Sequence, residues 1–205
     1  MINVKNAWAH LRKIQTHRKW VRYYCKALGI PMQGWLHDLS KYSPVEFFES
    51  VKYYCGDRSP IDKCKEINGY SMAWFHHRGR NKHHYEYWCD NFDKGCTANL
   101  MPKKYFLELV ADYLGAGKAY DKGDCFAFVK EYEWWQNKRK NPLKMDERQL
   151  IMLDTIFRNL ADLERALSGP AVDVYLASPG GRAMIESIYD KYKDGVNHSE
   201  LETPL

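Results

Sequence analysis

Four residues with metal-binding side chains form a spaced series along the chain. His17 comes first, the adjacent pair His37 and Asp38 begins 20 residues later (37 − 17), and Asp112 is the last member. Each lies in a segment whose apolar residues recur at helical spacing. Imidazole and carboxylate groups together suit a catalytic divalent cation, and few structural roles require both within apolar helices. The series therefore predicts a metal site.

The surroundings of these residues strengthen that prediction. His17 lies on the apolar face of its expected helix, although a single inward histidine is more often an ordinary core residue. If His37 and Asp38 are helical neighbours, they project about 100° apart and lean toward a common point, where Asp38 can bind one ion or bridge two. Asp112 lies within an apolar stretch, where a buried, unpaired carboxylate costs several kcal/mol that a bound cation would offset.

A second group of polar side chains lies between the two aspartates. Residues 76–84 contain four of the eight histidines of the chain, interleaved with three cations. The histidines are His76, His77, His83 and His84, and the cations are Arg78, Arg80 and Lys82. The segment is either part of a site or a solvated basic turn with capping histidines.

The elements that must position these side chains are predicted to be helical. Apolar residues recur at spacings of three and four, Pro and Gly mark the breaks, and no convincing alternating strand pattern occurs. We expect helices over residues 3–28, 32–39, 44–54, 61–76, 83–92, 102–120, 123–136 and 146–167, with a last short helix ending near residue 193. The predicted fold class is all-α, with a domain over 1–140 and a C-terminal helical extension over 141–205 packing on it.

Composition restricts the classes of protein. The 205 residues carry a net charge of +5, which suits an anionic ligand such as a nucleotide but makes nucleic-acid binding unlikely. No apolar run approaches the roughly 20 residues of a membrane span, and no signal peptide is evident, so we expect a cytoplasmic protein without membrane contact. The six cysteines lack Cys-x-x-Cys spacing, and we expect reduced thiols rather than a zinc site at Cys89 and Cys96.

The order His, His-Asp, Asp resembles that of the HD superfamily of metal-dependent phosphohydrolases. The 20-residue gap is typical of that family, and the strings over 36–41 and 110–114 match its signatures. The chain most resembles an uncharacterised bacterial or phage branch. The resemblance covers about residues 7–120 and implies an HD-domain-like helical bundle, with additional C-terminal helices. It also implies one or two divalent cations, with Mn, Mg, Co, Zn and Fe all open. The implied ligands of the first metal are His17, His37, Asp38 and Asp112.

In several branches of that superfamily, histidines between the central pair and the last aspartate bind a second metal or the phosphoryl group. Because helical neighbours differ by about 100°, we expect one histidine of each pair to face the metal. His77 and His83 are favoured, with His76 and His84 as alternatives. Glu86 is a candidate to orient a ligand histidine.

The resemblance implies a phosphohydrolase that acts on a nucleotide or a small phosphate ester or phosphodiester. His37, Asp38, Lys41 and Asp112 are the expected catalytic residues. The expected phosphate-binding residues are Lys41, Arg78, Arg80 and Lys82. No Gly-Tyr-Pro follows the histidine pair, which argues against cyclic-dinucleotide hydrolysis.

Several alternatives stay open at this point. HD-like helical cages also hold di-iron oxygenases, and a catalytically silent module that binds a nucleotide or a partner is a further reading. A homodimer is possible. Trp35, Tyr42 and Trp74 are candidates to stack on a base, although each is more often a core residue. His10 is a candidate proton donor or ligand-orienting residue, with an ordinary core or surface histidine as the alternative.

Overall fold

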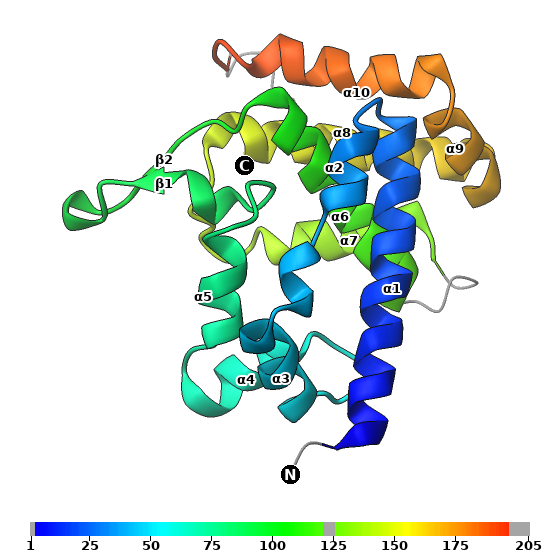
Figure 1. The fold of residues 1–205 in the computed structure, drawn as a ribbon. Helices are drawn as coiled ribbons and strands as arrows, with labels where there is room; N and C mark the ends of the chain where they lie inside the picture. The colour runs from blue at the N-terminus through cyan, green and yellow to red at the C-terminus, as the bar shows by residue number, and fades with distance from the viewer. Residues whose placement is uncertain (1–2, 121–125, 197–205) are drawn as a thin grey trace.

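A computed structural model of the protein describes residues 3–120 and 126–196. Within these residues the chain is mostly helical, with one small two-stranded sheet, which confirms the all-α prediction (Figure 1). The α-helices are α1 (Val4–Ala27), α2 (Pro31–Leu36), α3 (Pro44–Lys52), α4 (Pro60–Asn68), α5 (Met72–Arg78), α6 (Lys103–Tyr120), α7 (Phe128–Lys138), α8 (Glu147–Ala166), α9 (Gly169–Leu176) and α10 (Pro179–Tyr192).

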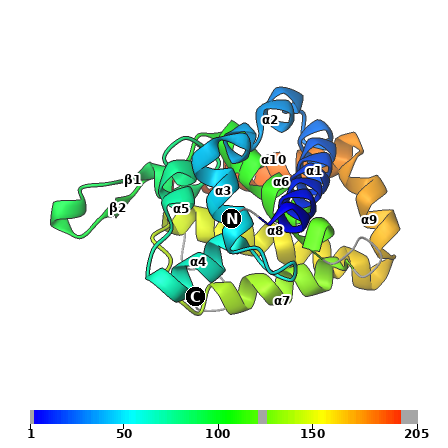
Figure 2. The same ribbon diagram turned by 60° about the horizontal axis from the view of Figure 1, so that its bottom comes forward.

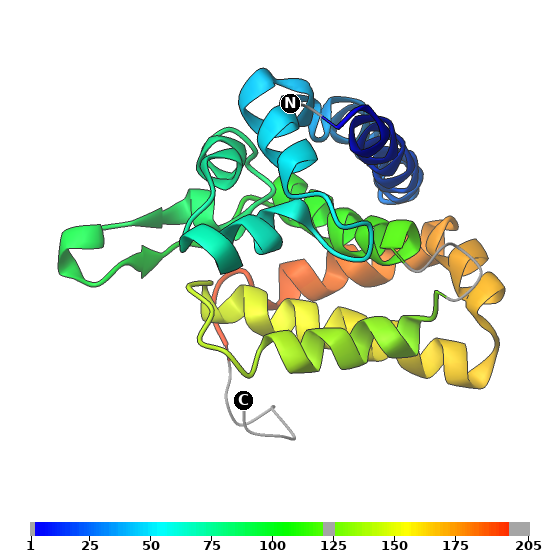
Figure 3. The same cartoon turned by 90° about the horizontal axis from the view of Figure 1, so that it is seen from below.

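The remaining elements are short. They are the 3-10 helices η1 (Leu39–Tyr42), η2 (Tyr85–Trp88) and η3 (Phe92–Lys94), and the strands β1 (Cys89–Asp90) and β2 (Thr97–Ala98). The two strands pair antiparallel in a hairpin that projects from the helical body in every view (Figures 1, 2 and 3). The helix predicted over 83–92 is therefore wrong, because this segment forms a 3-10 turn and the first strand of the hairpin.

Local signals explain where other predicted helices divide or shift. The single helix predicted over 61–76 is two helices, because Gly69 ends α4 in the left-handed conformation with φ of 78°. Ser71 then begins α5, its side chain accepting a hydrogen bond from the backbone N–H of Trp74. The helix predicted over 123–136 begins later, at Phe128, and its first three residues lie outside the described ranges. Helix α9 is an additional element between two breaks.

The long helices pack in pairs. Helix α1 lies along α6, and α7 runs beside α8 beneath them (Figures 2 and 3). The approach of α1 to α6 is close at Gly115, where an added Cβ would stand 2.6 Å from Cγ2 of Val21. Only a residue without a side chain permits this distance. Side chains of α1 and α6 that face each other beyond this contact are therefore held within a few ångströms.

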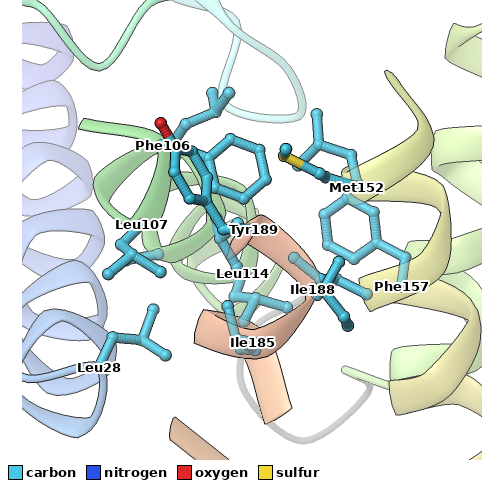
Figure 4. Packing of buried hydrophobic residues seen from close by; sticks show 14 of the residues in the cluster. Leu28, Phe106, Leu107, Leu114, Met152, Phe157, Ile185, Ile188 and Tyr189 are labelled. Carbon is cyan, nitrogen blue, oxygen red and sulfur yellow. The ribbon is translucent and has the colours of Figure 1, made fainter. Parts of the chain in front are cut away.

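One hydrophobic core joins the two predicted parts of the chain. Figure 4 shows Leu28 and Phe106 from the first part in one cluster of buried side chains with Phe157 and Ile185 from the C-terminal helices. Helix α8 is buried along the face that carries Met152, which is fully buried. Residues of α8 and α10 thus pack in the same core as α6 and help to hold that helix in place. Among the helices of residues 3–120 and 126–196, none combines the length with the apolar character that crossing a bilayer requires.

Candidate metal centre

His17, His37, Asp38 and Asp112 converge in the structure, and we call them the first cluster. The Nε2 atom of His17 lies 3.2 Å from Nε2 of His37, 3.2 Å from Oδ2 of Asp38 and 3.1 Å from Oδ1 of Asp112. Nε2 of His37 lies 3.3 Å and 3.5 Å from the same two oxygens. Ligands about 2.1 Å from one cation stand roughly 3.0–3.4 Å apart in octahedral or tetrahedral coordination. The spacing therefore fits a single metal ion.

The elements that carry these four residues differ in one respect from the sequence prediction. His17 projects from α1 and Asp112 from α6, as expected. His37 and Asp38, however, do not share a helix. His37 caps the C-terminus of α2 with a non-helical ψ of 129°, and Asp38 is left-handed with φ of 56°. A left-handed backbone is uncommon outside glycine, though aspartate tolerates it, and such positions concentrate at functional sites.

A second cluster adjoins the first and consists of Asp38, His77, His83 and His84. Each offers one ligand atom, and these atoms all lie within 4.8 Å of one another. Oδ1 of Asp38 lies 3.2 Å from Nε2 of His77 and 3.5 Å from Nε2 of His83. Within the described residues, Oδ1 of Asp38 and Nε2 of both His83 and His84 are buried without a hydrogen-bond partner. Buried polar atoms normally have partners, and three unpaired atoms this close together suit the coordination of a cation.

The second cluster includes three of the four histidines of the histidine-rich segment. His77 faces the second cluster, whereas His76 points away and contacts Oε1 of Glu46 through its Nδ1 at 2.6 Å. His83 and His84 both belong to the second cluster, which therefore contains one histidine of the first pair and both of the second, where one of each was expected. His83 and His84 lie in a turn before η2 and not in a helix. Which of them bind metal stays a prediction.

Two carboxylates that the sequence reasoning missed orient the histidines. Oε1 of Glu108 lies 3.0 Å from Nδ1 of His37 and 3.1 Å from Nδ1 of His83. Oε2 of Glu46 lies 2.7 Å from Nδ1 of His77. With Nδ1–H donated to a carboxylate, Nε2 keeps its lone pair and is directed at the clusters, an arrangement common around protein-bound metals. Glu108 lies four residues before Asp112 on α6, a spacing that marks a shared helix face.

The charges of the clusters act in different directions on different ligands. The carboxylates outweigh burial and raise the pKa of His37 and of His77, so a cation at these two residues competes with a proton. Burial alone would raise the pKa of Asp38, but His37, Lys41 and His77 outweigh it and hold that pKa well below its usual range. Burial, followed by the proximity of other histidines, lowers the pKa of His84 well below its ordinary value. Asp38 is therefore a carboxylate and His84 a neutral imidazole near pH 7, as metal ligands must be.

Lys41, in η1, stands at the edge of the first cluster. Its Nζ lies 2.5 Å from Oδ2 of Asp38, and Asp38 and Asp112 outweigh burial and raise the pKa of the lysine. Lys41 also lines a cavity of about 210 Å³ beside the clusters, together with His17, His77 and other residues. The expected contact between Lys41 and a phosphoryl group stays a prediction.

The three cations of the histidine-rich segment do not line that cavity. Arg78 lies over the ring of Phe75, and Nζ of Lys82 over the rings of Tyr87 and Tyr105. Arg80 is exposed. Their predicted role in binding phosphate at the metal centre has no geometric support, because none of the three lines the cavity beside the clusters.

The remaining candidate residues differ in whether they line the cavity. Trp74 lines the cavity, whereas Trp35 and Tyr42 lie outside it, against Arg22 and Arg18 respectively. His10 is buried and lines the cavity. Among the described residues, Glu86, Cys89 and Cys96 belong to none of the clusters of potential ligands.

Arg18 on α1 is a further residue that the sequence did not single out. Its Nε donates to the carbonyl oxygen of His37 at 2.8 Å, and its second nitrogen to that of Trp35 at 2.8 Å. These bonds tie the end of α2 to α1 and fix the turn that carries Asp38.

The comparisons with known proteins give a family without an activity. No curated protein and no solved structure matches the chain. Residues 6–157 match the sequence model of a family of unknown function (DUF5662). The match spans both clusters, Glu108 and part of α8, and because it covers most of the 205 residues, the chain belongs to that family.

Proposed function

We propose that the protein is an HD-type hydrolase that uses two divalent cations to cleave a phosphate ester or phosphodiester. The resemblance of the His, His-Asp, Asp series to the HD superfamily supports the proposal, and so does the geometry of the two clusters. The first cluster offers two imidazoles and two carboxylates, and the second offers three imidazoles and the shared carboxylate.

The observation that carries the proposal is the orientation of Asp38. Its Oδ2 faces His17 and its Oδ1 faces His77, so that one carboxylate belongs to both clusters. A carboxylate between two cations holds them close enough to act on one substrate, as two-metal phosphatases and nucleases do. A purely structural cation would need only one of the clusters.

The chemistry divides between the cations and the chain. Bound divalent cations supply Lewis acidity and lower the pKa of a coordinated water. Lys41 places a positive charge beside Asp38, where it neutralises charge on a phosphoryl oxygen. Glu108 and Glu46 hold the histidines in one tautomer. Ile14, Ala73 and Trp74 give the cavity apolar walls that limit access of bulk water.

The test is metal content and phosphate release from protein purified without chelator or affinity nickel. We expect up to two divalent cations per chain and release of phosphate from a panel of nucleotides and phosphodiesters. Activity should vanish after chelation and return on adding manganese or cobalt. Protein that takes up no divalent cation when each is supplied in excess contradicts the proposal. Metal-loaded protein that binds a nucleotide tightly and returns it unchanged with every cation supports the catalytically silent module instead.

A di-iron oxygenase is the second candidate, favoured by the three imidazoles of the second cluster, since imidazole suits iron as well as zinc. Iron as the bound metal, with turnover that consumes oxygen and releases no phosphate, would decide for this candidate. Manganese, cobalt or zinc with phosphate release would decide against it.

A further inference from the structure

One face of α1 continues from the metal ligand His17 into the cavity. Lys13 and His10 precede His17 by four and seven residues, so they lie on the same side of the helix. Both line the cavity, as His17 does. At 1.5 Å per residue, their backbone positions lie about 6 Å and about 10 Å along the helix from that of His17. The cavity therefore extends away from the metal centre along this row of side chains.

His10 is the most unusual member of the row. It is 6% exposed, and its Nδ1 is buried without a hydrogen-bond partner. Its ring packs near those of Phe47 and Tyr54, which offer it no charge. Burial, followed by the positive charge of Lys41, lowers the pKa of His10 to about 4. A neutral imidazole with an unused polar atom, in a field made positive by lysine, suits an anionic ligand.

Two further groups on the cavity wall carry a positive charge or a partial positive charge. Nζ of Lys13 is held by the carbonyl oxygen of Ala119 at 3.0 Å and lies 4.6 Å from the ring centroid of Tyr120. Across the cavity, Ser59 and Ile61 belong to the start of α4, whose first amide N–H groups carry a partial positive charge. The side chain of Ser59 makes no capping hydrogen bond to the helix.

We propose that His10, Lys13 and the first turn of α4 form an anion subsite that binds a second negatively charged group of the substrate. The inference rests on the proposed function for the first group, which is the phosphoryl group at the metal clusters. The substrate class is then a small molecule with a phosphate at one end and a phosphate or carboxylate at the other, separated by a short chain. The cavity volume of about 210 Å³ agrees with such a compact substrate.

The test compares ligands that differ only at the far end. Propane-1,3-diphosphonate and 3-phosphonopropionate carry a second anionic group, and propylphosphonate does not. We call the first two ligands dianions because each has two anionic groups. Calorimetric titration of the manganese-loaded protein should show the better dianion binding at least about tenfold more tightly than propylphosphonate, since one charge-assisted contact is worth that much. Which of the two dianions binds better identifies the second group. In Lys13→Met the preference should fall below about threefold, with propylphosphonate affinity and metal content unchanged.

Control variants separate a binding role from a structural one. Lys5→Met removes an exposed lysine from the same helix and should keep the full preference. Lys13→Arg, which keeps the charge, should retain most of it, and His10→Leu should lose part of it. Equal binding of dianions and propylphosphonate by the wild type, or a preference that survives Lys13→Met, overturns the subsite.

The proposed function and the subsite can fail separately. If the protein takes up no metal, the proposed function fails, and the same ligands are titrated into chelator-treated protein. A preference for the dianions that Lys13→Met removes would still support the subsite, and its absence would overturn it.

Discussion

The two metal clusters are built in different ways although they share Asp38. The first cluster takes His17 and Asp112 from long helices that pack on the hydrophobic core. The second takes His83 and His84 from a turn. Glu108 contacts His83, but no such contact with Glu108 occurs at His84. A site on packed helices is held more rigidly than a site on a turn. We expect the first cluster to keep its geometry when the second loses its own histidines, because packed helices hold His17 and Asp112.

The ligand sets differ as well. Two carboxylates and two imidazoles in the first cluster suit a wide range of divalent cations, including manganese and magnesium. Three imidazoles and one carboxylate in the second favour zinc, cobalt or iron. The comparison teaches that the two positions need not prefer the same metal, and variants that remove one cluster at a time test this.

The largest effect is expected from Asp38→Ala, which removes the ligand common to both clusters. Metal content should fall to near zero, and phosphohydrolase activity by at least about 1,000-fold, because the charge stabilisation lost is several kcal/mol. Far-ultraviolet circular dichroism should stay near that of the wild type. Asp93→Ala, an exposed position in η3, is the matched control and should keep its metal. Full metal content in Asp38→Ala would remove the basis for both clusters.

Replacing His83 and His84 together by alanine separates the clusters. The variant should bind one cation fewer per chain than the wild type, since the first cluster keeps all four of its ligands. Elemental analysis of both proteins after loading with manganese and with zinc measures the change. An unchanged metal count would limit this turn to a structural or substrate-binding role.

Glu108→Gln tests the support that both clusters receive from α6. The variant removes the negative charge that accepts hydrogen bonds from His37 and His83, while the side chain keeps its size. We expect metal affinity to fall by about 10–100-fold, the usual cost of losing such a partner. Competition with a fluorescent chelator measures the affinity, and Glu133→Gln on the exposed side of α7 is the control. Affinity within a factor of two of the wild type would refute the orienting role.

Arg18→Met is expected to have the smallest effect and to act through the backbone. It removes two hydrogen bonds to the end of α2 from a partly exposed side chain, so the free energy of unfolding should fall by about 1–2 kcal/mol. Metal affinity should fall less than in Glu108→Gln. Urea denaturation monitored by circular dichroism checks this, with Arg12→Met, exposed on the same helix, for comparison. Equal stability of the two variants would argue against a role for Arg18 in holding the turn.

Some features of the site were predictable from the sequence because they depend on local periodicity. The 3.6-residue period of α1 and α6 places His17 and Asp112 on inward faces. Their imidazole and carboxylate groups indicate metal binding. The same period relates Glu108 to Asp112, four residues apart on α6, so this carboxylate could have been identified from the helical pattern of the sequence. The all-α class follows from the same pattern.

Only the tertiary structure decided which side chains meet. Asp38 reaches both clusters because a left-handed turn replaces the expected helix, and His83 and His84 both face inward because no helix forms there. The contact between Glu108 and His37 joins residues 71 positions apart. Helical period fixes the face on which a residue lies, whereas contacts between distant residues depend on how α1 and α6 pack together.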